Sequence, residues 1–156
     1  MHEFRTTPSN ANGARKHRLL IGEANPALSD YLLAVLGADG HEVVAMASGT
    51  DLIDTLAVSL HPEFGSGHFH LVISEARMLG AEEARVLHKF GDRAKVPPFV
   101  FTTAFRDKEL QAKAKQFGAL AVLDKPLDID DLREIVNSSL HHVTGNRGQF
   151  VAGATA

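Results

Sequence analysis

The sequence predicts an α/β fold in which one parallel sheet is covered by helices on both faces. Short apolar runs typical of buried strands alternate with segments whose apolar residues recur at helical spacing, and the pair repeats five times between Arg18 and about Val143. Such alternation is typical of parallel sheets, whose strands are buried from both sides. A chain of 156 residues is long enough for one domain of this kind with a single core.

The predicted strands are short, apolar and mostly followed by polar residues. They cover Leu19–Ile21, Glu42–Met46, His70–Ser74, Pro98–Ala104 and Ala119–Leu123. Runs of this length favour strands, because amphipathic helices need about ten residues or more.

Four of the five predicted helices begin after a polar residue that can accept hydrogen bonds from the first helical N–H groups. These capping residues are Asn25, which precedes a proline, Ser48, Asp107 and Asp128. In each predicted helix, apolar residues three or four positions apart form a stripe that we expect to be buried. They consist of Leu28, Leu32, Val35 and Leu36; Leu52, Ile53, Leu56 and Leu60; Ala84, Leu87 and Phe90; Leu110, Ala114 and Phe117; and Leu132, Ile135, Val136 and Leu140.

Composition narrows the classes of partner. The net charge is −3, so the chain has no general attraction to nucleic acid or anionic membranes, and we expect the short basic cluster Arg15–Arg18 to be solvated. No apolar run approaches the roughly 20 residues of a bilayer span. The chain has no cysteine, and its nine histidines fit no standard zinc pattern. We expect a cytoplasmic domain over residues 17–143, with flexible tails at 1–16 and 144–156.

Polar residues follow the predicted strands. In an open parallel sheet, ligands bind beyond the carboxyl ends of the strands. We therefore expect Glu23, Glu75, Thr103 and Lys125 to meet at one edge. A hydroxyl and an ammonium can converge on one anion, so Thr103 and Lys125 suit a phosphate site.

The order and spacing of these motifs resemble the receiver domain of two-component response regulators, from about Arg18 to Leu140. The resemblance is carried by Ile21–Pro26, Leu71–Glu75, Thr102–Ala104, Gly118-Ala119 and Lys125-Pro126. It implies a doubly wound, flavodoxin-like sheet of five parallel strands in the order 2-1-3-4-5. Members of this family usually accept a phosphoryl group from a histidine kinase on an aspartate, with Mg²⁺ bound.

Carried over by position, Thr103, Lys125 and Pro126 match the family's phosphate-binding and switch positions, whereas the acidic positions depart from the pattern. The family's acidic pair becomes Glu23 and Ala24, and its phosphoacceptor aspartate becomes Glu75. Mg²⁺ requires near-octahedral oxygen ligands, and Ala24 supplies no carboxylate. The longer Glu75 displaces the nucleophilic oxygen by about 1 Å, a misplacement that can cost about a hundredfold in rate.

Two further residues bear on the expected site. Arg77, two positions after Glu75, can pair with that carboxylate, as can Lys125, so two carboxylates are balanced without a metal ion. Glu75 could instead be a solvated carboxylate at a strand end. Val122 stands at the family's aromatic-switch position, and a β-branched aliphatic cannot swing a ring between buried and exposed states. We expect no cofactor, no metal and absent or weak Mg²⁺ binding.

We therefore expect a pseudo-receiver that acts in signal transduction through phosphorylation-independent protein–protein interaction and is not an enzyme. The resemblance implies docking of a protein partner, or of a second copy as a homodimer, through the fourth helix, fifth strand and fifth helix. One alternative is a receiver that still responds to a phosphoryl donor or metal through Glu23, Thr103 and Lys125. An alternative of another class is a flavodoxin-like small-ligand binder or enzyme, which flavin absorbance would reveal.

Overall fold

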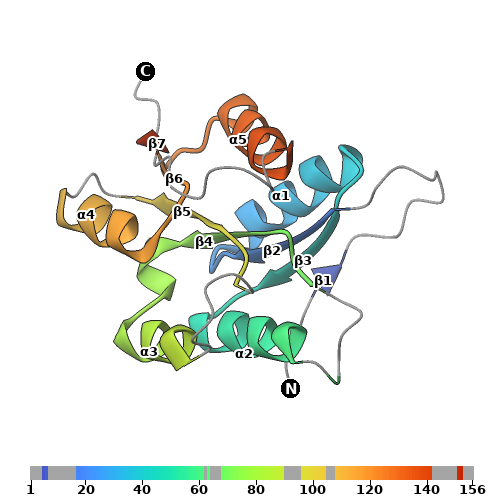
Figure 1. The fold of residues 1–156 in the computed structure, drawn as a ribbon. Helices are drawn as coiled ribbons and strands as arrows, with labels where there is room; N and C mark the ends of the chain where they lie inside the picture. Colours follow the sequence, from blue (N-terminus) through green and yellow to red (C-terminus); the bar gives the residue numbers. More distant parts are fainter. Residues whose placement is uncertain are drawn as a thin grey trace.

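A computed structural model describes residues 5–6, 17–61, 63, 68–89, 96–104, 108–141 and 151–152. Helices and strands alternate along the chain, as expected from the sequence (Figure 1). The elements are β1 (Arg5–Thr6), β2 (Arg18–Gly22), α1 (Pro26–Ala38), β3 (Glu42–Met46), α2 (Gly49–Leu60), β4 (Leu71–Glu75), the 3₁₀ turn η2 (Ala76–Met78), α3 (Ala81–Lys89), β5 (Phe99–Thr103), α4 (Lys108–Phe117), β6 (Ala121–Asp124), α5 (Ile129–His141) and β7 (Val151–Ala152).

The five central strands form the predicted parallel sheet. Their spatial order is β3-β2-β4-β5-β6, which is the order 2-1-3-4-5 of the five expected strands. The prediction of a doubly wound parallel sheet is therefore confirmed. The described part of the chain contains no helix that is both long and apolar enough to cross a membrane.

Two short strands extend the sheet beyond the prediction. β1 pairs antiparallel with β3, and β7 pairs parallel with β6, so the sheet has seven strands in the order β1-β3-β2-β4-β5-β6-β7. Both lie in segments that the sequence analysis assigned to tails. Polar or small residues without a period can still pair here, because an existing edge strand supplies the hydrogen-bonding partner. The other tail residues lie outside the described residues.

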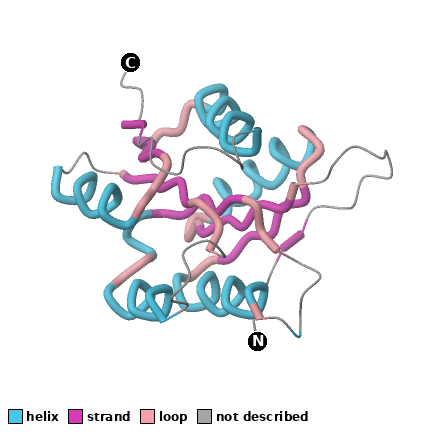
Figure 2. The backbone as a smooth tube through the Cα atoms, viewed as in Figure 1, coloured by secondary structure: helices cyan, strands magenta, loops and turns pink. Residues whose placement is uncertain are grey.

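Helices cover both faces of the sheet, and each face has its own core (Figure 2). Successive strand residues point to opposite faces, so Leu19 and Ile21 pack with α1 and α5, whereas Leu20 packs with α2, α3 and α4. The strand residues on both faces are almost fully buried. This two-sided burial explains why the strands are continuous apolar runs rather than alternating ones.

Local signals set the helix starts as expected. The Asn25 side chain accepts hydrogen bonds from the N–H groups of Ala27 and Leu28, at 2.9 and 3.2 Å. Ser48 caps α2, and Asp128 accepts from the first N–H groups of α5 in the same way. The expected cap Asp107 and the stripe residue Phe90 lie outside the described residues.

The turn after β4 packs tightly against the start of α2. A side chain at Gly49 would place its Cβ 1.9 Å from the carbonyl oxygen of Met78, and one at Gly22 would place it 2.8 Å from the Met78 sulfur. Glycine at these positions therefore lets η2 lie directly over β2 and α2. This contact positions the backbone that follows Glu75.

Replacing Gly49 with alanine is expected to lower the free energy of unfolding by about 1–2 kcal/mol, measured by urea unfolding. A Cβ only 1.9 Å from a backbone carbonyl oxygen should incur the upper part of the roughly 1–3 kcal/mol that overpacking costs. Alanine regains at most about 1 kcal/mol in helix propensity, so a net loss of about 1–2 kcal/mol remains. The matched control is Gly80→Ala, whose Cβ would meet only the flexible end of Glu83, at 3.1 Å. We expect that control to stay within about 0.5 kcal/mol of the wild type. An unchanged Gly49→Ala protein, or equal losses in both, would contradict this packing.

Candidate functional site at the carboxyl edge of the sheet

An acidic pair and a lysine meet at the carboxyl ends of the central strands. The Lys125 ammonium lies 2.7 Å from Glu23 Oε1 and 2.6 Å from Glu75 Oε1. Glu23 follows β2, Glu75 ends β4 and Lys125 follows β6. The expected convergence of these three residues is confirmed, and we call them the Glu23–Glu75–Lys125 cluster.

Backbone hydrogen bonds hold the cluster in place. The Glu23 N–H donates to the Met46 carbonyl at 3.0 Å, and the Lys125 N–H donates to the Thr103 carbonyl at 2.7 Å. The Glu23 side chain also accepts a hydrogen bond at Oε2 from the Asn25 N–H, at 3.0 Å. The segments that carry Glu23 and Lys125 are therefore anchored to a neighbouring strand or helix start.

Burial differs between the two carboxylates. The Glu23 side chain is 2% exposed, whereas those of Glu75 and Lys125 are each 21% exposed. Charged groups lose much solvation when buried, so a carboxylate as enclosed as Glu23 requires a cation or a proton. With two carboxylates and one ammonium, the cluster would carry an excess negative charge if both acids were ionised.

The pKa values of the two acids move in opposite directions. Burial raises the pKa of Glu23, and the hydrogen bond between its side chain and Glu75 raises it further, outweighing the contacts with Asn25 and Lys125. The same hydrogen bond from Glu23 lowers the pKa of Glu75, and Lys125 adds to this effect against the opposing effect of burial. Of the two acids, Glu23 therefore keeps its proton to the higher pH.

Lys125 stays charged in this environment. Burial by itself would lower the pKa of its ammonium, but hydrogen bonds to Glu23 and Glu75 raise the pKa above its ordinary value. The expectation that a cation reaches Glu75 is thus confirmed for Lys125. Arg77 lies exposed in η2, and its pairing with Glu75 stays a prediction.

The other expected site residues lie on the strands that end at the cluster or directly after them. Thr103 ends β5 and is 6% exposed. Ala24 and Pro126 are exposed, each directly beside a member of the cluster, and the Lys125–Pro126 peptide bond is cis. Val122 lies within β6 and is 1% exposed, opposite Phe101 of β5.

The sequence analysis missed the contribution of Ser74. This serine is fully buried near the end of the apolar strand β4, and its hydroxyl donates to the Glu75 carbonyl at 3.1 Å. The hydroxyl of Ser74 within an otherwise apolar buried run could have indicated this contribution, because buried polar groups need hydrogen-bond partners. Ser74 thereby engages the backbone at the residue that carries the second carboxylate.

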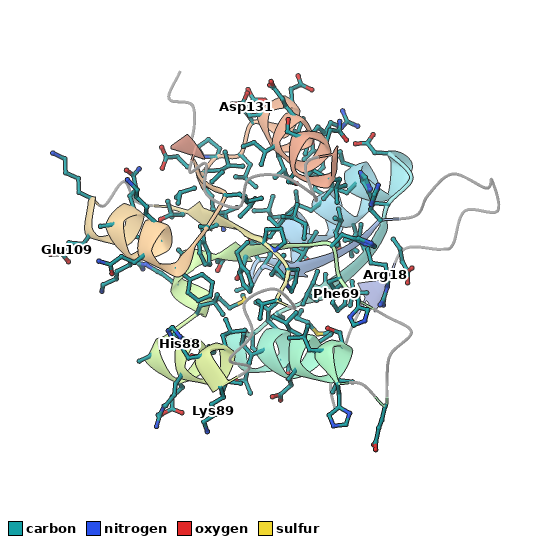
Figure 3. All side chains as sticks on the ribbon, viewed as in Figure 1. Arg18, Phe69, His88, Lys89, Glu109 and Asp131 are labelled. Carbon is teal, nitrogen blue, oxygen red and sulfur yellow. The ribbon has the colours of Figure 1, made fainter. Side chains whose placement is uncertain are left out.

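A second polar group lies at the opposite end of the sheet. The ring of His17 lies 5.2 Å from that of His70 and 6.0 Å from that of His41, and the Arg18 N–H donates to His70 Nδ1 at 2.9 Å. Burial lowers the pKa of His41 and of His70. Arg18 also stacks over Phe69, 4.6 Å from the ring centre (Figure 3). Among the described residues, no three or more acidic, histidine or cysteine side chains gather in a metal-binding arrangement.

Comparisons with known proteins agree with this architecture. Residues 19–137 match the model of the response regulator receiver domain. The chain is 27% identical over 144 residues to the transcriptional regulatory protein PdtaR of Mycobacterium tuberculosis, covering 90% of this chain and 66% of PdtaR. It is 30% identical over 138 residues to the transcriptional regulatory protein ZraR of Salmonella typhimurium, covering 88% of this chain but 29% of ZraR. The chain thus spans 66% or less of the length of these relatives.

Solved structures show the same fold. The non-phosphorylated HemR receiver domain from Leptospira biflexa matches with a TM-score of 0.66 at 20% identity, over 84% of this chain and 99% of that one. The signal receiver domain of an HD domain-containing protein from Pseudomonas fluorescens matches with a TM-score of 0.67 at 22% identity, over 83% and 98% of the two chains.

The raised pKa of Glu23 predicts how the free energy of unfolding changes with pH. Folded Glu23 holds its proton more tightly than the unfolded chain does, so its stabilising contribution is complete below the unfolded pKa and is lost as pH rises through the folded pKa. Glu23→Gln has no proton to release there. The stability of the wild type relative to Glu23→Gln, measured by urea unfolding, is therefore expected to fall as pH rises above the ordinary glutamate pKa of 4.5.

Glu75 does not obscure this comparison, because its pKa is lowered and it titrates below the chosen pH range. The control is Glu134→Gln, on the exposed side of α5, whose stability relative to the wild type should change little over the same range. The stability difference between the wild type and Glu23→Gln could instead stay constant, or grow in favour of the wild type as pH rises. Either result would show that the pKa of Glu23 is not raised in the folded protein.

Proposed function

This chain belongs to the response regulator receiver domain family, and we propose that within it the chain is an atypical pseudo-receiver. It transmits signals by binding a protein partner, without phosphorylation of an aspartate and without catalytic activity of its own. The observation that carries this proposal is the Lys125 ammonium, bonded to both Glu23 and Glu75 at 2.7 and 2.6 Å. Lys125 thereby places a cation from within the chain against both acids of the cluster.

The composition of the site also supports the proposal. Glu75 takes the acceptor position, and its Oε1 is already engaged by Lys125. Ala24 takes one position of the acidic pair and provides no carboxylate for a metal ion. Mg²⁺ demands near-octahedral geometry at about 2.0–2.1 Å and dehydrates reluctantly, so the loss of one ligand weakens its binding strongly. We propose that the domain binds Mg²⁺ weakly or not at all.

The packing around Val122 further supports the proposal of a single conformation. Val122 fills the aromatic-switch position and is 1% exposed. Its branched side chain is stiff and has no polar ring to move. The rings of Phe99, Phe101 and Phe117 contact one another on the same side of the sheet, with centroids 5.2–5.7 Å apart. A ligand shifts an equilibrium only through unequal affinity for two states, and this packing offers no evident second state.

We propose that the partner docks on α4, β6 and α5, which we call the α4–β6–α5 face. Lys108, Lys113 and Lys115 are exposed on α4, and acidic side chains such as Glu109 and Asp131 extend from α4 and α5 (Figure 3). Charged residues around a docking surface direct association and partner choice. A protein partner or a second copy suits a chain of net charge −3 better than nucleic acid or a membrane does, and we place it in the cytoplasm.

Incubation with acetyl phosphate and Mg²⁺ tests the proposal directly. The wild type is expected to gain no hydroxylamine-labile phosphoryl group, because Glu75 is longer than aspartate and is held by Lys125. Intact-mass spectrometry before and after hydroxylamine provides the measurement. A labile phosphoryl adduct located at Glu75 would establish instead a receiver that still responds to phosphoryl donors.

The matched control restores both missing features in one protein, Ala24→Asp/Glu75→Asp. This variant should gain the labile adduct under the same conditions, which shows that the assay detects an acyl phosphate in this fold. Titration of Mg²⁺ followed by amide NMR gives a second comparison. Saturable shifts around residues 23 and 75 are expected in the double variant, and in the wild type only with a dissociation constant above about 1 mM.

Partner binding should depend on the α4–β6–α5 face more than on the cluster. In quantitative pull-down from the host, Lys113→Glu/Lys115→Glu is expected to reduce retention of the partner about tenfold, whereas Glu75→Gln changes it little. Asp54→Lys, on the exposed side of α2, controls for charge reversal elsewhere. If Glu75→Gln abolishes retention while the lysine changes are silent, the cluster controls output and the domain is not a fixed interaction module.

A further inference from the structure

Three histidines gather at the amino ends of neighbouring strands, at the end of the sheet opposite the Glu23–Glu75–Lys125 cluster. His17 precedes β2, His41 precedes β3 and His70 precedes β4. The centre of the His17 ring lies 5.2 Å from that of His70 and 6.0 Å from that of His41. All three residues are partly buried. We call them the histidine cluster, and the function proposed above makes no use of it.

His70 holds the start of β4 to the start of β2 through two reciprocal hydrogen bonds. The His70 N–H donates to the Arg18 carbonyl at 2.8 Å, and the Arg18 N–H donates to His70 Nδ1 at 2.9 Å. The strand pairing proper begins one residue later, with Leu19 opposite Leu71. The imidazole of His70 therefore takes the place of a strand carbonyl and extends the pairing to the first residue of β2.

The hydrogen bond to Nδ1 fixes the protonation state of His70. Nδ1 can accept from the Arg18 N–H only while it carries no proton, so the structure holds the neutral ring with its hydrogen on Nε2. A proton on Nδ1 would turn the acceptor into a donor that faces another donor. The Arg18 N–H would then lose this acceptor, which is costly in a partly buried place.

The surroundings of the cluster oppose its protonation. Burial lowers the pKa of His70, and the nearby His17, Arg18 and His68 lower it further, against an opposing effect of the Arg18 backbone. Burial and His17 likewise lower the pKa of His41, although Asp39 raises it. The neutral form of the cluster is therefore the form that suits the folded state.

Two carboxylates lie beside the cluster, and an arginine engages each of them. Glu42 lies 3.4 Å from the Arg18 guanidinium, which also stacks over Phe69 (Figure 3). Asp39 accepts hydrogen bonds from Arg133 of α5, at 2.8 and 3.1 Å. A positive charge gained by the cluster would thus meet carboxylates that are already paired with other cations.

We infer that the histidine cluster is a proton-sensitive latch at the amino ends of β2, β3 and β4, closed while His70 is neutral and opened when His70 gains a proton. Opening releases the Arg18 N–H from β4. The adjacent residue His17 joins β2 to β3, because its carbonyl accepts from the Glu42 N–H at 2.9 Å. The latch therefore lets acidification loosen one end of the sheet. This inference goes beyond the proposed function and involves neither the Glu23–Glu75–Lys125 cluster nor the α4–β6–α5 face.

The latch predicts that acidification favours unfolding. Folded His70 binds a proton more weakly than the unfolded chain does. Its contribution to stability is therefore complete above the ordinary histidine pKa of 6.5 and is lost as pH falls from there toward the folded pKa. Within that range, one such histidine raises the unfolding equilibrium constant by up to about tenfold per pH unit. Glu23 acts in the opposite direction, so the test needs a variant that leaves Glu23 in place.

The test compares the full chain with His70→Asn by urea unfolding between about pH 7.5 and 5.5. The Asn Oδ1 can take the place of Nδ1, accept from the Arg18 N–H and gain no proton in this range. The ratio of the wild-type unfolding constant to that of His70→Asn should rise about threefold to tenfold as pH falls. The control is His88→Asn, on the exposed side of α3, whose ratio should stay constant. A constant or falling ratio for His70→Asn would overturn the latch.

Two NMR measurements locate the effect at His70. Ring nitrogen shifts of the wild type should show Nδ1 without a proton at about pH 7.5 and a ring that titrates below the ordinary histidine pKa of 6.5. Between about pH 7.5 and 5.5, the Arg18 amide should lose about threefold to tenfold more protection from hydrogen exchange in the wild type than in His70→Asn.

Either NMR measurement can refute the latch without the unfolding data. A proton on Nδ1 at about pH 7.5, or a ring that titrates at or above the ordinary pKa, would show that His70 is not held neutral by Arg18. Equal loss of Arg18 protection in both proteins would show that His70 does not control this end of the sheet. None of these experiments involves a phosphoryl donor, a metal ion or the protein partner, so the latch and the proposed function can fail separately.

Discussion

The Lys125 ammonium resolves an electrostatic conflict that the sheet itself creates. Gly22 of β2 lies opposite Ser74 of β4, so the next residues on these parallel strands, Glu23 and Glu75, fall side by side. Adjacent strands lie about 4.8 Å apart, a separation at which two ionised carboxylates repel each other strongly when poorly solvated. Lys125 comes from β6, two strands away from β4, and reaches both acids. The cluster therefore links the ends of three strands, and the Lys125 N–H joins β5 to them.

The division of charge within the cluster follows from burial. Glu23 is nearly inaccessible and has its pKa raised, whereas Glu75 is partly exposed and has its pKa lowered. Removing one member of the cluster would leave a buried charged group without its partner. That loss of stability is generally larger than the stabilisation that the pair provided. A cluster of this kind is consistent with the proposed fixed conformation, because every change of its charge carries an energetic cost.

The sequence was sufficient for features that depend on local rules or on strand direction. Helix starts at Asn25, Ser48 and Asp128 follow from side-chain capping, and the meeting of Glu23 with Lys125 follows from the parallel order of strands. The unequal burial of the two acids could not be predicted, because it depends on side-chain rotamers and on packing. The contact between Gly49 and Met78 was missed for a similar reason, since close backbone approach leaves no periodic pattern. The strands β1 and β7 escaped detection because two residues form a strand only when a neighbouring edge supplies their hydrogen bonds.

The strand β6 lies between the acidic cluster and the outer edge of the parallel sheet. Its carboxyl end leads into Lys125, which neutralises the acidic cluster, and its outer edge pairs with β7 through Ala121 and Val122. In a receiver whose site changes charge on phosphorylation, the signal begins at the carboxyl end and alters the neighbouring surface. If the cluster is held by the Lys125 ammonium and accepts no phosphoryl group, as we propose, that source of change is absent. Partner binding then depends on the α4–β6–α5 face itself rather than on a change of charge in the cluster.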